Sequence, residues 1–220
     1  MGKLIVIEGL DGSGKSTQLE LLPKNLLNKG IKSQTVSFPD YDSDSSALVK
    51  MYLGGAFGKK PGDVNAYAAS AFYAVDRFAS FKTDWGKAYL NGATVICDRY
   101  TTSNAVHQAS KLEAEERDNY LDWLYEFEFN QLGIPKPDAV VFLDMPIDVS
   151  QRLMSGRYEG DEGKKDIHER DTAYLEHCRE AALYAADRLG WTVVHCSENG
   201  EVRTRQSIAD EVYAAVSQVL

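Results

Sequence analysis

Residues 9–17 read GLDGSGKST and directly follow an apolar run at residues 4–7. This is the G-x-x-x-x-G-K-[ST] spacing of a phosphate-binding loop, in the setting that such a loop requires: a strand, a glycine turn and then a helix. The glycines let backbone N–H groups approach an anion, Lys15 adds a cation at the β- and γ-phosphates, and the Ser16 hydroxyl can bind Mg²⁺. The positive end of the helix points at the same place. The sequence therefore predicts a nucleoside triphosphate site, with a ligand-free glycine turn as the alternative.

Five short apolar runs are typical of buried β-strands. They occupy residues 4–7, 34–38, 94–97, 139–143 and 192–196. Their apolarity is continuous rather than alternating, which indicates strands covered on both faces. Helical segments alternate with these strands at residues 15–29, 64–90, 114–132, 147–155, 167–189 and 203–219. This order predicts an α/β fold with a five-stranded parallel sheet and helices on both faces, formed by one domain over residues 1–220.

Ligands of such sheets bind beyond the carboxyl ends of the strands. The residues at or just past those ends are Glu8, Pro39, Asp98, Asp144 and Ser197. We therefore seek the site among these residues and their neighbours. A glycine-rich, highly charged stretch lies between two predicted helices and predicts a short lid at about residues 156–166.

Charge and cysteine content limit the class of protein. The net charge of −9 argues against a protein that binds nucleic acid or a membrane surface, because such proteins carry an excess of basic residues. Cys97, Cys178 and Cys196 show no C-x-x-C spacing, which favours reduced, buried thiols. No apolar run approaches the length of a membrane span, and no signal peptide is recognisable. We expect a cytoplasmic protein with no nucleic-acid or membrane partner.

The phosphate loop alone does not separate kinases from GTPases and ATPases. The N-K-x-D stretch with which GTPases of this loop type usually specify guanine is absent, and so is the signature loop of ABC-type ATPases. The features that discriminate must therefore lie at other strand ends.

Asp98 and Arg99 follow the third predicted strand. An aspartate at this position can hold Mg²⁺ or its water shell, and the adjacent arginine offers a planar fork for a second phosphate. The alternative is a helix cap followed by a surface cation. Residues 38–41, FPDY, end the second predicted strand and provide a weaker signal for the floor of a pocket.

Tyr73 and Arg77 are four residues apart in a predicted helix, so they share one face. A flat ring and a guanidinium fork on one face suit an aromatic base, through stacking and a hydrogen bond to a carbonyl group. The neighbouring rings Phe72, Phe78 and Phe81 are better explained as core residues. We assign Tyr73 to the site because Arg77 beside it is costly to bury without a polar partner.

Together these motifs resemble the thymidylate kinase family. The resemblance covers nearly the whole chain and rests on GLDGSGKST at 9–17, FPDY at 38–41, FYAVDR at 72–77, DRYTTSN at 98–104, LGIPKPD at 132–138 and ERD at 169–171. It implies a P-loop nucleoside monophosphate kinase fold, a homodimer, ATP with Mg²⁺, and phosphorylation of dTMP to dTDP. A kinase for another nucleoside or nucleoside monophosphate, and a non-catalytic nucleotide-sensing P-loop protein, are the alternatives.

The resemblance also implies roles at the donor side. The metal would be served by Ser16 and Asp98, and Arg152 would form a platform for adenine. The donor phosphates would be held by Gly9, Asp11, Gly12, Ser13, Gly14, Lys15, Ser16 and Thr17.

At the acceptor side, Asp11 is similar to the acidic residue near the sugar 3′-hydroxyl of dTMP. Tyr73 would stack on thymine, Arg77 would meet a thymine carbonyl and Arg99 would grip the acceptor phosphate. The remaining acceptor residues would be Phe38, Pro39, Tyr41, Asn104 and His107, the last standing where the family typically has tyrosine or phenylalanine beneath the sugar.

Two departures from the family pattern matter. Asp40 and Tyr41 stand where many members have an arginine for the acceptor phosphate. The phosphate loop also has no arginine, and family members whose loop lacks one take the needed cation from the lid. Arg157 is the first candidate, followed by Lys164 and Lys165. The predicted catalytic residues are therefore Lys15, Arg99 and Arg157.

Overall fold

The computed structural model of the protein describes residues 1–157 and 172–220. Its main sheet has five parallel strands in the order β2-β3-β1-β4-β5. The strands are β1 (Lys3–Gly9), β2 (Ser33–Ser37), β3 (Thr94–Asp98), β4 (Ala139–Asp144) and β5 (Thr192–His195). Each lies within two residues of its predicted range at either end, so the predicted sheet is confirmed.

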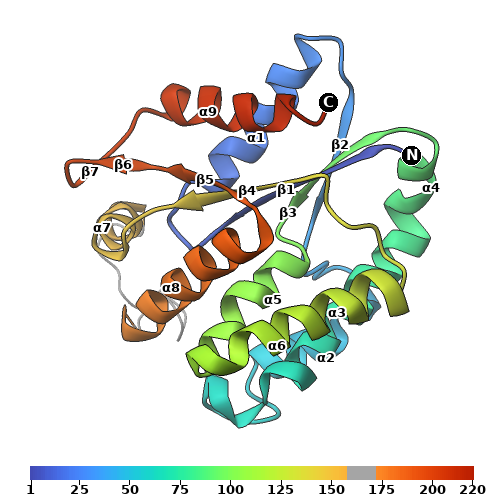
Figure 1. Cartoon of the computed structure of the whole chain (residues 1–220), viewed down its shortest axis with the longest axis vertical. Helices are drawn as coiled ribbons and strands as arrows, with labels where there is room; N and C mark the ends of the chain where they lie inside the picture. The colour runs from blue at the N-terminus through green and yellow to red at the C-terminus, as the bar shows by residue number, and fades with distance from the viewer. Residues whose placement is uncertain (158–171) are drawn as a thin grey trace.

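Helices connect and cover these strands (Figure 1). In the described residues they are α1 (Lys15–Leu27), α2 (Ala47–Leu53), α3 (Ala66–Ser80), α4 (Gly86–Leu90), α5 (Thr101–His107), α6 (Ala114–Tyr125), α7 (Ile147–Arg157), α8 (Thr172–Leu189) and α9 (Arg205–Ser217). Two predicted helices contain π-helical turns, η3 (Phe81–Trp85) and η5 (Glu126–Gln131). The seven-residue helix α2 was not predicted, because so short a segment shows little helical periodicity.

A small hairpin of β6 (Ser197–Glu198) and β7 (Glu201–Val202) was also not predicted. Its turn residues Asn199 and Gly200 have φ values of 51° and 79°. Two positive φ values are what a tight hairpin turn of the Asn-Gly type requires. The Asn-Gly pair was therefore an available signal for this hairpin.

The sheet is covered on both faces, as predicted (Figure 1). Helices α1 and α9 pack on one face, where Ile5 and Ile7 of β1 meet Leu22 and Val212. Leu4 and Val6 point to the other face and join a separate buried cluster. Each fully buried aliphatic side chain of this kind stabilises the fold by about 1.5–3 kcal/mol.

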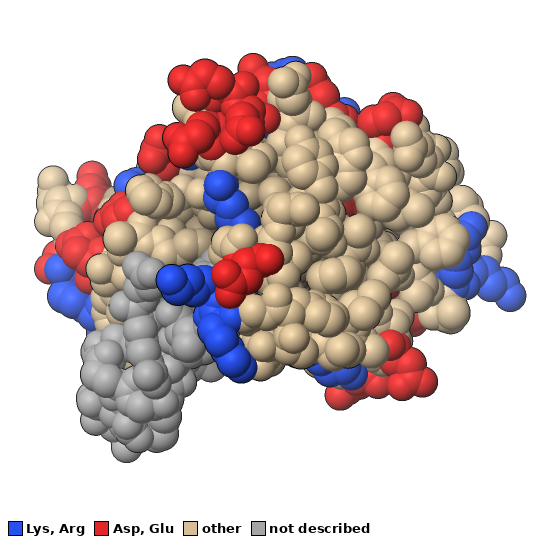
Figure 2. Space-filling model, turned by 90° about the horizontal axis from the view of Figure 1, so that it is seen from below, with Lys and Arg blue, Asp and Glu red and all other residues tan. Residues whose placement is uncertain are grey.

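The lower side of the molecule in Figure 1 carries α2, α3 and α6. Figure 2 shows this side as a broad region of uncharged residues with charged side chains around it. Large apolar side chains are exposed on both α2 and α3, among them Leu48, Met51, Tyr67 and Val75.

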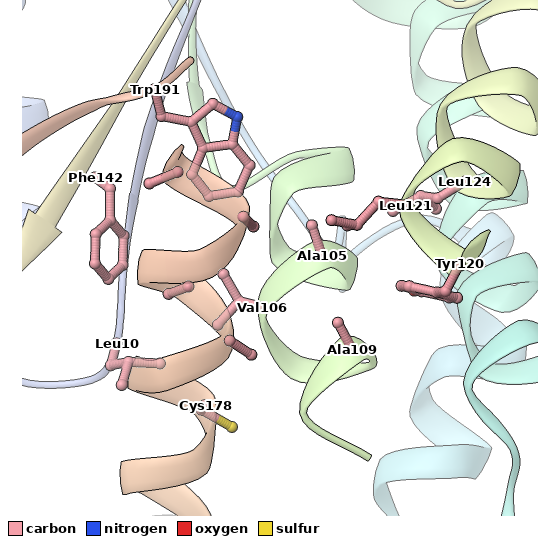
Figure 3. Close-up of a cluster of buried hydrophobic side chains, with 14 of the residues drawn as sticks. Leu10, Ala105, Val106, Ala109, Tyr120, Leu121, Leu124, Phe142, Cys178 and Trp191 are labelled. Carbon is pink, nitrogen blue, oxygen red and sulfur yellow. The ribbon is translucent and has the colours of Figure 1, made fainter. Parts of the chain in front are cut away.

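Helix α8 packs between the sheet and α5 (Figure 3). Small side chains on α8 permit this close packing, and they include Ala181, Ala182, Ala185 and Ala186, all buried. Cys178, on the same helix, is fully buried beside α5. The packing places one end of α8 close to the sheet edge that carries the phosphate loop.

Strand register brings the predicted site residues to one sheet edge. Ile7 pairs with Asp98, Asp98 also pairs with Ser37, and Gly9 pairs with Leu143. The carboxyl ends of four neighbouring strands therefore lie side by side there. In the described part of the chain, no helix is long and apolar enough to cross a membrane.

Candidate active site

The phosphate loop forms a tight turn between β1 and α1. Gly12 has a φ of 79°, and a Cβ atom there would lie 3.0 Å from the carbonyl oxygen of Ser150. Both the left-handed backbone and this close approach require glycine. Lys15 arches back over the loop, and its Nζ donates hydrogen bonds to the carbonyl oxygens of Gly9 (2.7 Å) and Leu10 (3.2 Å).

Burial lowers the pKa of Lys15 to about 8, and nearby Arg99 acts in the same direction. The carboxylate of Asp11, 3.9 Å from Nζ of Lys15, opposes this shift. Lys15 and Arg99 thus share a confined place with the carboxylates of Glu8, Asp11 and Asp98, and burial is the main cause of the lowered lysine pKa. A polyphosphate bound there would add negative charge beside Lys15 and raise its pKa again.

A cavity of about 430 Å³ lies over this loop. All seven residues from position 11 to position 17 line it, together with Asp98 and Arg99. The structure thus brings together the predicted donor residues of the loop, while Gly9 ends β1 and offers its carbonyl oxygen to Lys15. Leu153, Met154 and Arg205 also line the cavity, and sequence reasoning missed all three.

Arg152, expected beneath adenine, does not line this cavity. Its guanidinium lies 3.3 Å from Asp148 and donates to the carbonyl oxygen of Gly200 in the β6–β7 turn, at 2.5 Å. Arg205, the first residue of α9, is the arginine that faces the donor cavity. No local motif marks Arg205, because its place depends on how α9 packs against α1.

The surroundings of the Asp98 carboxylate suit a metal ligand. One carboxylate oxygen accepts a hydrogen bond from Ser37 (3.3 Å), and the other is buried with no hydrogen-bond partner among the described residues. Asp98 and Ser16 line the same cavity. The described residues contain no cluster of three or more His, Cys, Asp and Glu suited to a metal. One carboxylate and one hydroxyl are the sparse set that Mg²⁺ takes when phosphates supply other ligands.

Arg99 lies between two cavities. Its φ of 65° is left-handed, a conformation that costs a non-glycine residue about 1–2 kcal/mol. The side chain donates to Asp11 at 2.9 Å and lies 3.7 Å from the buried carboxylate of Glu8. Burial alone would raise the pKa of Asp11, but Arg99 and Lys15 outweigh burial and lower it. Asp11 and Arg99 line both the donor cavity and a second cavity.

This second cavity has a volume of about 290 Å³. Its lining contains all nine predicted acceptor residues: Asp11, Phe38, Pro39, Tyr41, Tyr73, Arg77, Arg99, Asn104 and His107. The residues that sequence reasoning missed are Tyr52, Leu53, Tyr100, Ser103, Gln108 and Tyr174. Tyr52 and Leu53 belong to the unpredicted helix α2.

Arg77 is almost fully buried, with a polar partner that the sequence did not reveal. Its Nε and Nη2 donate to the two carboxylate oxygens of Glu128 at 2.7 and 2.5 Å. Thr101 also donates to Glu128 (2.7 Å), and Nη1 of Arg77 donates to the carbonyl oxygen of Tyr100 (3.3 Å). These bonds fix the plane of the guanidinium at the cavity wall.

His107 lies between Arg99 and helix α8. Nε2 of His107 is 3.2 Å from the guanidinium of Arg99, and Nδ1 is 3.6 Å from Sγ of Cys178. Burial is the main cause that lowers the pKa of His107 to about 4, and the nearby Arg99 acts in the same direction. The imidazole is therefore neutral at physiological pH.

Comparison with known proteins decides the family. A family model described as thymidylate kinase matches residues 7–208. The chain belongs to the thymidylate kinase family. A thymidylate kinase of Mycobacterium tuberculosis (strain ATCC 25618 / H37Rv) is 34% identical over 186 residues, covering 83% of this chain and 84% of the relative. The human thymidylate kinase is 31% identical over 162 residues, covering 72% and 69%.

The fold agrees with this assignment. A solved structure of thymidylate kinase from Candida albicans matches with a TM-score of 0.71 at 21% identity, covering 99% of this chain and 92% of that one. The predicted P-loop nucleoside monophosphate kinase fold is thus confirmed, and so is the predicted function of an ATP-dependent thymidylate kinase.

Asp144 and Ser197, two further strand-end residues, line neither cavity. The Asp144 carboxylate pairs with Arg179 of α8 (2.7 Å) and His195 (3.0 Å), and Ser197 begins β6. The Asp144–Arg179 pair ties α8 to the sheet.

The predicted lid falls largely outside the described residues. Lys164 and Lys165 lie in that range, and for Arg157 only the backbone, at the end of α7, is described. The assignment of the lid cation therefore stays a prediction.

Proposed function

We propose that the chain acts as one kinase domain that transfers the γ-phosphate of ATP to dTMP, giving dTDP and ADP. The observation that carries this proposal is the shared lining of the two cavities by Asp11 and Arg99. A donor on the phosphate loop and an acceptor in the neighbouring cavity would meet at the Arg99 guanidinium. The family supplies the identity of the two nucleotides.

No general base is needed for this reaction. The acceptor phosphate is mostly dianionic at neutral pH, because its second pKa is about 6. Catalysis then rests on alignment of the two phosphates and neutralisation of their charge. Lys15 would hold the donor phosphates. Arg99 would give up its contact with Asp11 and bind the acceptor phosphate. Asp11 would then be free to accept a hydrogen bond from the sugar 3′-hydroxyl.

Ser16 and Asp98 would hold Mg²⁺, with the unpartnered oxygen of Asp98 as the strongest support. When bound, Mg²⁺ neutralises charge on the donor phosphates. An Asp98→Asn variant should need at least tenfold more Mg²⁺ for half-maximal rate, about 1.4 kcal/mol of lost binding.

The acceptor base would lie between Tyr73 and the Arg77–Glu128 pair. The Tyr73 ring can stack on thymine, Arg77 has N–H groups beyond the three that bond Glu128 and Tyr100, and the Asn104 side chain lines the same cavity. We further propose that Arg157 supplies the lid cation. An Arg157→Ala variant should lose kcat while binding dTMP nearly as well as the wild type.

Assembly and location form part of the same proposal. Leu48 and Met51 on α2 and Tyr67 and Val75 on α3 are exposed and apolar, which suits a homodimer because exposed apolar patches mark interfaces. The three cysteines are free and buried, which suits the reducing cytoplasm. Sedimentation of the wild type and of a Val75→Glu variant tests the dimer.

The central test is a coupled assay of ADP release with ATP·Mg²⁺ and a panel of nucleoside monophosphates. We expect the highest kcat/KM with dTMP. Faster turnover with AMP, CMP or GMP would contradict the proposed acceptor. If no nucleotide of the panel were turned over, the proposed kinase activity would be contradicted.

A further inference from the structure

Tyr174 of α8 lines the acceptor cavity. The other lining residues come from the strand-end loops and from α2, α3 and α5, so Tyr174 is the contribution of α8 among the described residues. The side chain is half-buried, whereas Leu175 beside it is buried in the core. Tyr174 packs against the same core cluster and is hydrogen-bonded to Cys178 and Ser110, and it also forms part of the cavity wall.

The position of Tyr174 is set by contacts between α8 and α5. Cys178 lies one turn after Tyr174, on the same face of the helix. Its Sγ is 3.6 Å from Nδ1 of His107 and 3.4 Å from the hydroxyl of Ser110. Figure 3 shows Cys178 on the side of α8 that faces α5. Tyr174 therefore lies on the face of α8 that packs against α5, and both Tyr174 and His107 line the cavity.

We infer that Tyr174 is an acceptor-binding residue, whose ring packs against the nucleotide in the cavity next to His107. This inference rests on the proposed function and assigns a further residue to its acceptor site. An imidazole covers less of a bound sugar than a six-membered aromatic ring, and Tyr174 adds apolar surface on that side.

The chemistry of Tyr174 suits a site for an anionic nucleotide. The side chain carries no charge near neutral pH and therefore does not repel an anionic ligand, and burial raises the pKa of its hydroxyl above the ordinary value. The acceptor cavity is small, about 290 Å³, so each aromatic side chain makes up a substantial part of its wall. Loss of the ring would leave one side of the ligand open to water.

Calorimetric titration with dTMP alone tests this inference on Tyr174→Leu, Tyr174→Phe and the wild type. Leucine keeps apolar bulk for packing, and phenylalanine keeps the ring. We expect Tyr174→Leu to raise the Kd for dTMP about tenfold, the usual loss for one apolar contact, with KM for ATP within about twofold of wild type. Tyr174→Phe should bind dTMP within about twofold of wild type, because the ring is retained.

Tyr184 offers a matched control on the same helix. Its hydroxyl donates to Asp118 at 2.8 Å, and it does not line the acceptor cavity. Tyr184→Leu should leave the Kd for dTMP unchanged. An equal rise in Kd for both leucine variants would overturn the inference, because it would indicate a general effect on α8.

Wild-type protein allows a second measurement that does not depend on how a variant folds. In protein with isotope-labelled tyrosine, NMR should show proton–proton contacts between the Tyr174 ring and bound dTMP. Absence of these contacts in the dTMP complex, or an unchanged Kd in a folded Tyr174→Leu variant, would overturn the inference. Failure of the wild type itself to bind dTMP would instead contradict the proposed function, and with it this inference.

Discussion

Nη1 of Arg99 lies 3.2 Å from Nε2 of His107. A guanidinium can only donate hydrogen bonds, so Nε2 of His107 is the acceptor and the ring proton resides on Nδ1. Nδ1 in turn faces Sγ of Cys178 at 3.6 Å. One histidine thus links the predicted phosphate-gripping arginine to helix α8, in a neutral state with a fixed tautomer.

Replacement of His107 by alanine should relax discrimination against ribonucleotides. We propose that His107 lies against the deoxyribose, where its ring leaves little room for a 2′-hydroxyl. In His107→Ala, kcat/KM for the ribose form of TMP relative to dTMP should rise by about tenfold or less, roughly 1 kcal/mol of lost exclusion.

His107→Phe restores bulk at the same position and should not relax this preference. The measurement is steady-state kinetics with both nucleotides. An unchanged ratio in a folded alanine variant would leave His107 with a structural role only.

The Arg99→Lys variant should lose much more activity than a charge-conserving change normally costs. Lysine keeps the cation but lacks the planar fork that serves Asp11 and His107 here and would serve the acceptor phosphate. We expect kcat and kcat/KM for dTMP to fall at least tenfold, because 1.4 kcal/mol of lost transition-state stabilisation suffices for that. Kinetics within about twofold of wild type would remove Arg99 from the reaction.

Donor binding should weaken at alkaline pH. The pKa of Lys15 in the free protein is lowered to about 8, so its charge is lost as the pH rises through 8. The protonated form binds phosphates, and kcat/KM for ATP reports the free enzyme, so this parameter should fall above pH 8 by up to about tenfold per pH unit.

An arginine at position 15 would keep its charge over the same pH range. A Lys15→Arg variant with residual activity should therefore lack this alkaline decrease. A wild-type profile that stays flat to pH 10 would show that Lys15 remains charged in the free protein.

The Glu128→Gln variant should destabilise the fold and weaken acceptor binding together. Glu128 neutralises the buried Arg77, and removal of one member of a buried ion pair costs about 3–5 kcal/mol because the other charge is left uncompensated. Urea unfolding measures the loss of stability, and titration with dTMP measures the loss of affinity.

The surface ion pair Arg188–Asp118 serves as the comparison for the buried pair of Glu128 and Arg77, because exposed ion pairs contribute little to stability. Asp118→Asn should change the free energy of unfolding by less than about 1 kcal/mol. If Glu128→Gln were as mild, Arg77 would not depend on this carboxylate.

The sequence by itself determined the parts of this protein that depend on local pattern. Apolar runs located the five strands; those of the central strands β1, β3 and β4 are largely buried on both faces, whereas the edge strands β2 and β5 are partly exposed. The phosphate loop and the short motifs around Phe38, Tyr73 and Arg99 located the acceptor lining, because each follows a strand or shares a helix face. These relations span a few residues and follow from backbone geometry.

Only the tertiary structure decided which distant groups complete the site. Glu128 pairs with Arg77 across 51 residues of sequence, and Cys178 meets His107 across 71. Such contacts depend on how α6, η5 and α8 pack over the sheet, and packing is set by the fit of many side chains at once. No spacing rule connects partners so far apart, and for the same reason Tyr174 in the acceptor cavity had no signal in the sequence.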